Sequence, residues 1–421
     1  MGSKISGFYN KTFEERLQIL KYVCGLSEEE VTLLKELKPI SFQIADKMIE
    51  NVVGIFGLPL GIATHFLING KDYLVPMAIE ETSVVAAASK GAKFARFLGG
   101  FESKATEQIM IGQVQIFAKG SKQQKVTRLI KQNKEKILEI ANSTDKILVS
   151  YGGGAKDIEI RRFKEFMVLH LLVDVKDAMG ANAINTMCER VAPYIEQICK
   201  CKTGIKIISN LAIYRLVKAR AVFSKVELEK DSSKGVVEDI IKAWKFACAD
   251  RFRATTHNKG IMNGIDAVAI ATGNDFRALE AGAHSYASLS GKYKPLTKYW
   301  KDKQGNLVGE IEIPIQVGIV GGSTRVNPMA KLCLKILGVK SAKELAEVMG
   351  AVGLAQNFAA LYALATTGIQ YGHMRLHAKN IAIQAGATGD EIEKVAMAMI
   401  ENNQINEAFA REILKKIKQG A

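Results

Sequence analysis

The sequence predicts a mixed α/β (α+β) protein built from more than one domain. Its 421 residues exceed what one ordinary hydrophobic core organises, so we expect two or three domains. Hydrophobic residues make up 48% of the chain and charged residues 24%, and seven prolines leave little room for disordered linkers. Segments with helical spacing and strand-like segments both occur, which indicates compact globular domains of mixed type.

The first 108 residues combine helices with at least one strand. Residues 13–26 have helical spacing, and Ser27 with the three glutamates after it is typical of a second helix start. Residues 72–79 alternate as a strand does and lead into a small-residue helix, for which Thr82 or Ser83 is the candidate N-cap. Because side chains alternate along a strand, only one of Glu80 and Glu81 should face a given pocket.

A second unit begins near residue 108. Residues 167–175 are almost continuously apolar, as expected of a strand covered on both faces. The loop 177–182, a helix over 183–199 and a strand over 206–209 complete a β-loop-α-β unit, in which a phosphate can approach the helix N-terminus. Residues 152–154 are three glycines, a second place where backbone can come close to a ligand. Neither segment has the G-x-G-x-x-G spacing of a dinucleotide fingerprint.

The rest of the chain is helix-rich from about residue 220. Glycines at 318–322 predict a sheet-to-helix junction, and the last 45 residues are expected to be helical. Thr388-x-x-Glu391 has the spacing of a capping box. A buried stripe at helical spacing follows it, made of Ile392, Val395, Ala396, Met399 and Ile400. His373 and His377 lie just before this helical element, where either is a candidate for a hinge to a mobile cap.

The formal net charge is +15, which permits a nucleic-acid partner and equally suits a polyanionic small molecule such as coenzyme A or a dinucleotide phosphate. The densest basic stretch covers residues 119–134 and predicts one helix with lysines along one side and apolar residues along the other. No aromatic residues are interleaved for base stacking. A solvated helix face is therefore favoured over an anion-binding surface.

Six cysteines are dispersed through the chain, which does not suggest a disulfide framework, so we expect reduced thiols. Cys199-Lys200-Cys201 lacks a second ligand pair, which favours a helix end over a metal site, and no metal is expected. The first 16 residues have scattered charges in place of an apolar signal core, and no run of eighteen apolar residues is found. We therefore expect a soluble, cytoplasmic protein.

One short stretch has the make-up of a reaction centre. Residues 256–266, followed by Gly273-Asn274-Asp275, combine a lysine, amides, carboxylates and flexible glycines. A buried lysine is costly unless carboxylates share its charge, so Lys259 with Asp266 and Asp275 nearby is suited to hold an ammonium against a polar reacting group. A carbonyl that becomes an alkoxide is the expected guest.

A series of spaced motifs runs in order from about residue 45 to the C-terminus. Its members are Glu50-Asn51-Val52-Val53-Gly54, Glu81-x-Ser83, residues 177–182, residues 256–266, Gly273-Asn274-Asp275, residues 318–322 and Gly372-His373-Met374. Together they resemble hydroxymethylglutaryl-coenzyme A reductase. The missing membrane anchor makes the chain similar to the soluble, second class of that family. Where the anchored class has a regulatory serine, this chain has Lys379, so control by phosphorylation there is not expected.

The resemblance implies a four-electron reduction of a coenzyme A thioester to mevalonate with two nicotinamide cofactors, or the reverse reaction. It implies that Lys259 stabilises the oxyanion of each hydride transfer and that Asp275 links its amine to Glu81. Glu81 would supply a proton at the aldehyde stage, and His373 would protonate the departing thiolate. The sequence does not tell whether mevalonate is made for isoprenoids or consumed as a carbon source.

The resemblance also implies binding residues. For the substrate they are Ser83, Arg253, Asn263 and Gln356, with Asn210 as a weaker transfer. For the dinucleotide they are Asp145, Gly154, Asp177, Met179, Gly180 and Asn182. A carboxylate at the adenosine ribose accepts hydrogen bonds from a free 2'-hydroxyl and repels a 2'-phosphate, so Asp145 favours NAD(H). NADP(H) stays possible because Lys146 and nearby basic residues can accommodate the phosphate.

The implied organisation has three parts. Residues 1–108 and 220–372 would form a large substrate-binding domain, residues 109–219 an inserted ferredoxin-like NAD-binding domain, and residues 373–421 a C-terminal helical flap. A homodimer or larger assembly, with the active site between subunits, is also implied. The opposing hypothesis is a basic nucleic-acid-binding protein that uses the lysines of residues 119–134 and has no such activity.

Overall fold

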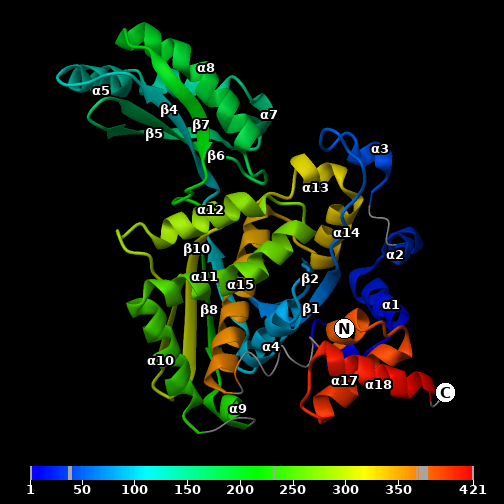
Figure 1. Ribbon diagram of the computed structural model, residues 1–421. Coiled ribbons are helices and arrows are strands. Elements are labelled where there is room, and N and C mark those ends of the chain that lie inside the picture. The colour runs from blue at the N-terminus through cyan, green and yellow to red at the C-terminus, as the bar shows by residue number, and fades with distance from the viewer. Residues whose placement is uncertain (1, 37–39, 231–233, 367, 369–377, 420–421) are drawn as a thin grey trace.

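The computed structural model describes residues 2–36, 40–230, 234–366, 368 and 378–419. Two sheets organise these residues, one of six strands and one of four (Figure 1). The larger sheet has the order β2-β1-β3-β8-β10-β9. Its strands are β1 (Leu60–Ile68), β2 (Lys71–Ala78), β3 (Phe101–Ala105), β8 (Leu216–Phe223), β9 (Thr297–Lys301) and β10 (Leu307–Pro314).

Helices pack on the larger sheet around one long central helix, α15 (Ala342–Ala365), which contacts β3, β8 and β10. Gly91 makes close packing possible, since a Cβ there would lie 2.2 Å from the carbonyl oxygen of Ala355. Within the described residues α15 alone is long and apolar enough to cross a membrane by length and composition, and 78% of its most apolar window is buried in the protein. It is a core helix. The helices around it are α4 (Val84–Arg96), α9 (Lys225–Lys230), α10 (Val236–Ala249), α11 (Arg251–Ala271) and α12 (Phe276–Ala287).

The smaller sheet has the order β5-β6-β4-β7, and all its neighbouring strands are antiparallel. This strand order, with α8 packed on β4 and β7 and α6 packed on β5, is the ferredoxin-like arrangement. The nearly continuous apolar run predicted as a strand is β6, which is buried along almost its whole length. The helices pack on one of its faces, which carries Met167, Leu169, Leu171 and Val173, so the predicted helix cover on both faces is not found. The elements are β4 (Ile109–Ile116), α5 (Lys122–Gln132), α6 (Lys134–Asn142), α7 (Lys146–Ser150), β5 (Gly154–Arg162), β6 (Met167–Asp174), α8 (Ala181–Cys199) and β7 (Thr203–Ser209).

The chain leaves and re-enters the larger sheet at one place. β3 runs into the smaller sheet and β8 returns from it, and these two strands pair directly, with Ala105 opposite Val217. Thr106 joins the two crossings, because its hydroxyl donates to the carbonyl of Tyr214 and accepts from the N–H of Leu216. The smaller sheet therefore projects from the body on two adjacent segments, as Figure 1 shows.

The basic stretch forms two helices instead of the one predicted. α5 ends and α6 begins at Asn133, whose side-chain amide donates to the carbonyl of Leu129 at 2.8 Å and so competes with the helical hydrogen bonds. The apolar sides of both helices are buried, and Lys119 and Lys134 form ion pairs with Glu165 and Asp157. The lysines thus lie on a solvated face, as favoured from the sequence.

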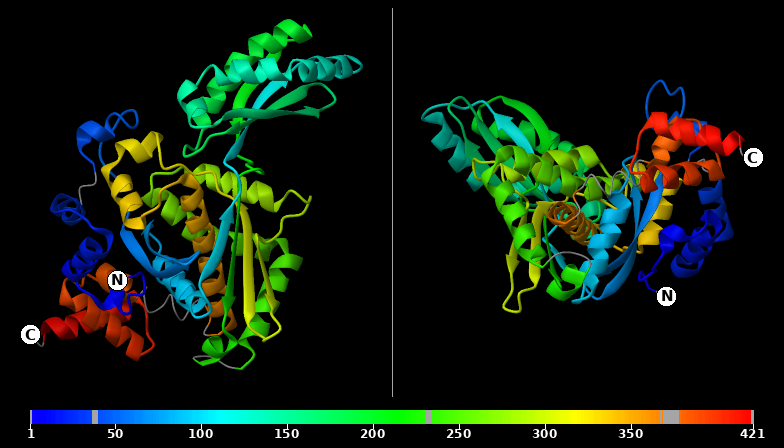
Figure 2. Two further views of the ribbon diagram at one scale, coloured as in Figure 1. Left: turned by 180° about the vertical axis from the view of Figure 1, so that it is seen from behind. Right: turned by 60° about the horizontal axis from the view of Figure 1, so that its bottom comes forward.

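Further helices lie at the two ends of the chain (Figure 2). The N-terminal ones are η1 (Phe8–Asn10), α1 (Phe13–Cys24), α2 (Glu28–Lys35) and α3 (Phe42–Ala45), and α1 packs on α14 (Pro328–Leu337), which follows α13 (Gly322–Val326). The C-terminal α17 (Asp390–Glu401) and α18 (Glu407–Gln419) share a small core of their own. The predicted capping box is half formed: Glu391 accepts from the N–H of Thr388, but the N-cap is Gly389, which has no side chain to cap the helix.

Candidate functional site

An ion pair joins two of the predicted catalytic side chains. Glu81 lies in the turn between β2 and α4, and the Nζ atom of Lys259 on α11 donates to its Oε2 atom at 2.9 Å. Asn263 lies one helical turn after Lys259, and its amide donates to the same carboxylate oxygen at 3.4 Å. Glu80 is exposed, so of the two neighbouring glutamates only Glu81 faces this centre.

Two expectations for this stretch are corrected. The Lys259 side chain is 58% exposed in the chain, not buried, because the buried positions of this helical turn go to His257 and Asn258. Asn258 bonds the backbone of Lys294 and Leu296, and His257 bonds the Thr297 hydroxyl, so both hold the helix in place. The stretch is also regular helix throughout, and its glycines allow close packing or leave open space instead of giving flexibility.

Ser83 and Gln356 present buried polar atoms without partners among the described residues. Ser83 stands at the N-cap position of α4 with a φ of 73°, but its hydroxyl does not cap the helix, which corrects the capping prediction. Its Oγ atom and the Oε1 atom of Gln356 are both buried and without a hydrogen bond. A non-glycine residue in the left-handed region and unsatisfied buried acceptors are features that favour a ligand site.

Arg253 and Asn210 lie apart from the ion pair. Arg253 belongs to the first turn of α11, where partial burial lowers its pKa, and its backbone N–H donates to the capping Asp250. Asn210 follows β7 and is exposed, and its carbonyl accepts from Gln316 at 3.1 Å. No contact among the described residues joins either side chain to Glu81.

Asp275 caps α12 instead of bridging Lys259 and Glu81 as the resemblance implied. Its Oδ1 atom accepts from the backbone N–H groups of Arg277 and Ala278 and pairs with the Arg277 guanidinium at 3.1 Å. Asp275 also lines a large cavity.

That cavity has a volume of about 790 Å³ and lies between the ferredoxin-like unit and the body. Of the predicted dinucleotide residues, Asp145, Met179, Gly180 and Asn182 line it. Gly180 is the N-cap of the 19-residue α8 and has a φ of 99°, so the N-terminus of a long helix opens on the cavity. Asp145 caps the short α7 through its Oδ1 atom, which accepts from the N–H of Leu148 at 2.8 Å.

Gly154 and Asp177 do not line this cavity, and packing inside the protein accounts for both. A Cβ at Gly154 would lie 2.3 Å from the Asn142 side chain, which brackets the backbone of Ala155. The glycines at 152–154 therefore bring backbone close to other protein atoms, not to an open ligand site. Asp177 accepts from the N–H of Ala342 through Oδ1 and from the N–H of Ile319 through its carbonyl.

Some predicted residues are not described by the structure, and some residues at the site were not predicted. His373 and its neighbour candidate His377 lie outside the described residues. Arg277, Thr186 and Asn327 line the cavity but were missed, since single polar residues on helix ends give no pattern in the sequence. Asn274 belongs to the Gly-Asn-Asp motif, but no role was predicted for it. Its Oδ1 atom accepts from the N–H of Gly318 at 2.8 Å. Among the residues that the structure covers, no group of three or more His, Cys, Asp or Glu side chains could hold a metal ion.

The carboxylate, ammonium and amide centre in the body and the long helix N-terminus that opens on a large cavity suit a nucleotide-dependent oxidoreductase. The family model described as hydroxymethylglutaryl-coenzyme A reductase matches residues 12–378, and the chain belongs to this family. The chain therefore interconverts hydroxymethylglutaryl-coenzyme A and mevalonate with a nicotinamide cofactor. Nothing found supports the alternative of a nucleic-acid-binding protein.

Relatives match over nearly the whole chain. The 3-hydroxy-3-methylglutaryl-coenzyme A reductase of Archaeoglobus fulgidus is 57% identical over 99% of this chain and 95% of its own length. A probable reductase of Borreliella burgdorferi is 37% identical over 98% and 95%. The class II reductase of Streptococcus pneumoniae, whose structure is described as bound to NADPH in open conformations, is 41% identical with a TM-score of 0.82. That match covers 97% of this chain and 100% of the other.

Proposed function

We propose that Lys259, Glu81, Asp275 and His373 carry out the two hydride transfers of this reductase. The observation that carries the proposal is the 2.9 Å contact from Lys259 to the same Glu81 oxygen that Asn263 reaches. An ammonium held there stabilises the alkoxide that forms when hydride adds to the thioester, and again when hydride adds to the aldehyde. Asp275 is assigned to this centre by the Gly-Asn-Asp motif, and in the single chain it lines the cavity and pairs with Arg277.

Two proton transfers complete the sequence of steps. When the hemithioacetal collapses, the carbon–sulfur bond breaks and the coenzyme A thiolate takes a proton, for which we propose His373 by the Gly-His-Met motif. In the second reduction the carbonyl oxygen of the aldehyde becomes the alcohol of mevalonate, and we propose that Glu81 supplies that proton. The pair of Glu81 and Lys259 can share this proton because their side chains already form a hydrogen bond.

The substrate would lie along the N-terminal side of α4 and α11. Arg253 is suited to the free carboxylate of the substrate, since a guanidinium pairs with a carboxylate through two parallel hydrogen bonds. Ser83, Gln356 and Asn263 would bind its polar groups, and the unpartnered Ser83 and Gln356 oxygens support this role. Asn210 is the weakest of these proposals, because it is exposed and lies away from the ion pair.

The dinucleotide would occupy the 790 Å³ cavity with its pyrophosphate at the N-terminus of α8. Met179, Gly180 and Asn182 would then contact it directly, whereas Gly154 and Asp177 would shape the surrounding backbone. Asp145 would face the adenosine ribose through its Oδ2 atom, since Oδ1 is engaged by Leu148. On this basis NAD(H) is favoured over NADP(H), although a Streptococcus relative binds NADPH.

We further propose a homodimer or larger assembly with the active site between subunits. Lys259 is largely exposed in the single chain, and Ile49, Val53 and Phe56 leave 65%, 101% and 92% of their surface exposed. A second copy that covers this apolar segment would also remove water from the catalytic centre. The division into residues 1–108 with 220–372, residues 109–219 and residues 373–421, and a cytoplasmic location, belong to the same proposal.

The deciding experiment follows the absorbance of the reduced nicotinamide when purified protein receives hydroxymethylglutaryl-coenzyme A, in parallel with NADH and with NADPH. We expect two cofactor molecules oxidised for each free thiol released, with the higher kcat/KM for NADH. A preference for NADPH would contradict the assignment of Asp145 to the ribose. Absence of oxidation with either cofactor, from folded and oligomeric protein, would contradict the proposed centre.

A further inference from the structure

Arg215 is a fully buried arginine whose partners are neutral. Its side chain is 1% exposed, and it lies between the end of the ferredoxin-like unit and the start of β8. Burial lowers its pKa to about 9, against the opposing effect of Asp174 and Asp177. Across the described residues no carboxylate forms an ion pair with it. Burying a guanidinium without such a pair is costly, so its position calls for an explanation.

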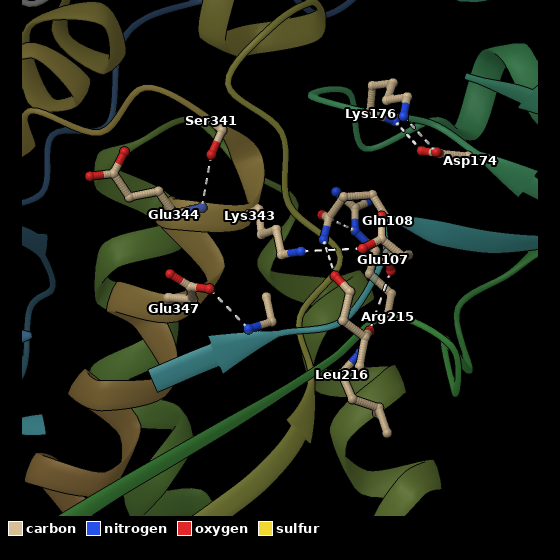
Figure 3. A network of polar contacts seen from close by, with 12 residues as sticks. Glu107, Gln108, Asp174, Lys176, Arg215, Leu216, Ser341, Lys343, Glu344 and Glu347 are labelled. Carbon is tan, nitrogen blue, oxygen red and sulfur yellow. Dashed lines mark hydrogen bonds and ion pairs between the residues drawn. The ribbon is translucent and has the colours of Figure 1, made fainter. Parts of the chain in front are cut away.

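The guanidinium bonds to three separate segments, and Figure 3 shows Arg215 beside its partner in the first of them, Gln108. Its Nε atom donates to the side chain of Gln108, in the segment that enters the ferredoxin-like unit, at 2.8 Å. Its terminal nitrogens donate to the carbonyls of Ala178 at 3.2 Å and Met179 at 3.3 Å, in the loop before α8. One of them also donates to the carbonyl of Val317, in the glycine-rich segment of the body.

Two of these segments belong to opposite walls of the cavity. Met179 and Gly180 line it from the ferredoxin-like unit, and Gly318 lines it from the body. The walls touch behind the cavity, since a Cβ at Gly318 would lie 2.7 Å from the backbone nitrogen of Met179. Arg215 itself is not among the lining residues, so it supports the walls from behind.

The contact between Arg215 and the Met179 carbonyl fixes the orientation of the peptide group that joins Met179 to Gly180. In a trans peptide the carbonyl and the following N–H point in opposite directions. Because the Met179 carbonyl points to the buried guanidinium, the N–H of Gly180 points away from it, towards the side on which Gly180 lines the cavity. This N–H is the first of the unpaired donors at the N-terminus of α8, the part of a helix that binds anions.

We propose that Arg215 is a positioning residue for the dinucleotide: it fixes the carbonyls of Ala178, Met179 and Val317 behind the cavity and so presents the α8 N-terminus to the pyrophosphate. This inference rests on the proposed use of the cavity for the cofactor. Arg215 does not contact the cofactor, and it acts on cofactor binding and not on the substrate centre at Glu81 and Lys259.

The test compares Arg215→Lys with the wild type. Lysine keeps the charge but cannot bond three carbonyls and Gln108 at once, because it lacks the planar fork of donors. We expect the Kd of NADH, measured by its fluorescence, to rise about tenfold or more, and the KM of hydroxymethylglutaryl-coenzyme A to stay within twofold. Arg96→Lys is the control, since Arg96 likewise donates to a backbone carbonyl, that of His65, and also to the Ser3 hydroxyl and Asp72, but lies away from the cavity.

Several results would overturn the inference. A folded Arg215→Lys protein with an unchanged Kd for NADH would do so. If Arg215→Lys raises the Kd of NADH and the KM of the thioester by the same factor and lowers the unfolding temperature, Arg215 has only a structural role. Should Arg215→Lys fail to fold, Gln108→Leu, which removes one partner only, is expected to raise the Kd for NADH about threefold, and no change would count against the inference. Asn182→Ala separates the two proposals: if it leaves NADH binding unchanged in an active enzyme, the cavity is not the cofactor site.

Discussion

Lys259 is assigned to catalysis but is largely exposed in the chain. Its replacement should therefore affect turnover much more than stability. The side chain is 58% exposed and its partner Glu81 is 36% exposed, so the pair adds little to the free energy of unfolding. The ammonium would instead act on charge that appears only during the reaction, where a single well-placed donor has a large effect.

We expect Lys259→Ala to lower kcat by a factor of at least about 100, because the oxyanion loses its main electrostatic partner. The unfolding temperature should change by no more than a few degrees. Turnover is measured by nicotinamide absorbance and folding by circular dichroism. Lys242→Ala is the control, an exposed lysine paired with Asp239 on α10. Retention of more than about a tenth of the rate would remove Lys259 from the mechanism.

Asp266 and Glu280 form a pair of carboxyl groups between α11 and α12. Burial, together with the hydrogen bond that protonated Asp266 donates to Glu280, raises the pKa of Asp266 to about 9, whereas the hydrogen bond with His284 lowers the pKa of Glu280. Lys259 also acts on Glu280 by its charge. The pair thus keeps one proton at neutral pH, held on Asp266. Asp266 releases this proton at neutral pH when the protein unfolds, because the carboxyl then has a pKa near 3.8.

Stability should therefore fall as pH rises from about 5 to 9, the range in which the folded state holds a proton that the unfolded state has released. For one group the slope is at most about 1.4 kcal/mol per pH unit. Asp266→Asn keeps the neutral form and should flatten this part of the profile of urea unfolding. Glu280 contributes in the opposite sense only below about pH 4.5, outside this window. Equal slopes for both proteins would contradict the protonated Asp266.

Close contacts between helices in this protein depend on glycines. α4 and α15 approach so closely at Gly91 that a Cβ would lie 2.2 Å from the Ala355 carbonyl oxygen and 2.8 Å from its carbon. Backbone atoms cannot turn aside as a flexible side chain can, so the two helices would have to separate.

Gly91→Ala should destabilise the protein by about 1–3 kcal/mol or more, the usual effect of overpacking a dense core. The free energy of unfolding is measured by urea titration. Gly260→Ala is the matched control, because Gly260 also lies within a helix but has open space around its Cβ position in the chain. There alanine should be neutral or stabilising by up to about 1 kcal/mol. Similar losses in both variants would argue against the close helix contact.

The elements that the sequence predicted best are those with one strong pattern. β6 and α8 were predicted within a few residues, because an apolar run and a long helical repeat need no tertiary information. The break at Asn133 was missed, since a side chain that competes for a helical carbonyl leaves the hydrophobic repeat intact. The glycines of residues 256–266 suggested flexibility, but Gly264 serves a close contact with α15, which sequence alone does not reveal.

At the site, the sequence motifs located Glu81, Lys259 and Asn263, which the fold brings to one carboxylate oxygen. The sequence did not reveal that Asp177 accepts hydrogen bonds from the backbone N–H groups of Ile319 and Ala342, because these residues lie about 140 and 165 positions later in the chain. Arg215 was also missed: a single arginine before a strand looks like a surface residue until its burial is known.

For the whole molecule, the C-terminal helices matter because α17 and α18 have their own core and share none of the main one. Deleting residues 373–421 should therefore leave the body folded and the Kd of NADH within about twofold, while turnover is lost with His373. Fluorescence titration and the absorbance assay measure the two effects on the same preparation. Loss of NADH binding in the truncated protein would show that the last helices also support the cofactor site.

The pairing of β3 with β8 has an evolutionary consequence. Because Ala105 and Val217 are direct neighbours in the sheet, a tight turn of a few residues could join them and turn the two strands into a plain hairpin. The ferredoxin-like unit is then a module set into the tip of a hairpin, and its acquisition or exchange would leave the architecture of the body intact. A chimaera that exchanges residues 106–215 would keep the β3–β8 pairing, but its new unit would also have to reproduce the contacts of Asp177 and Arg215 with the body.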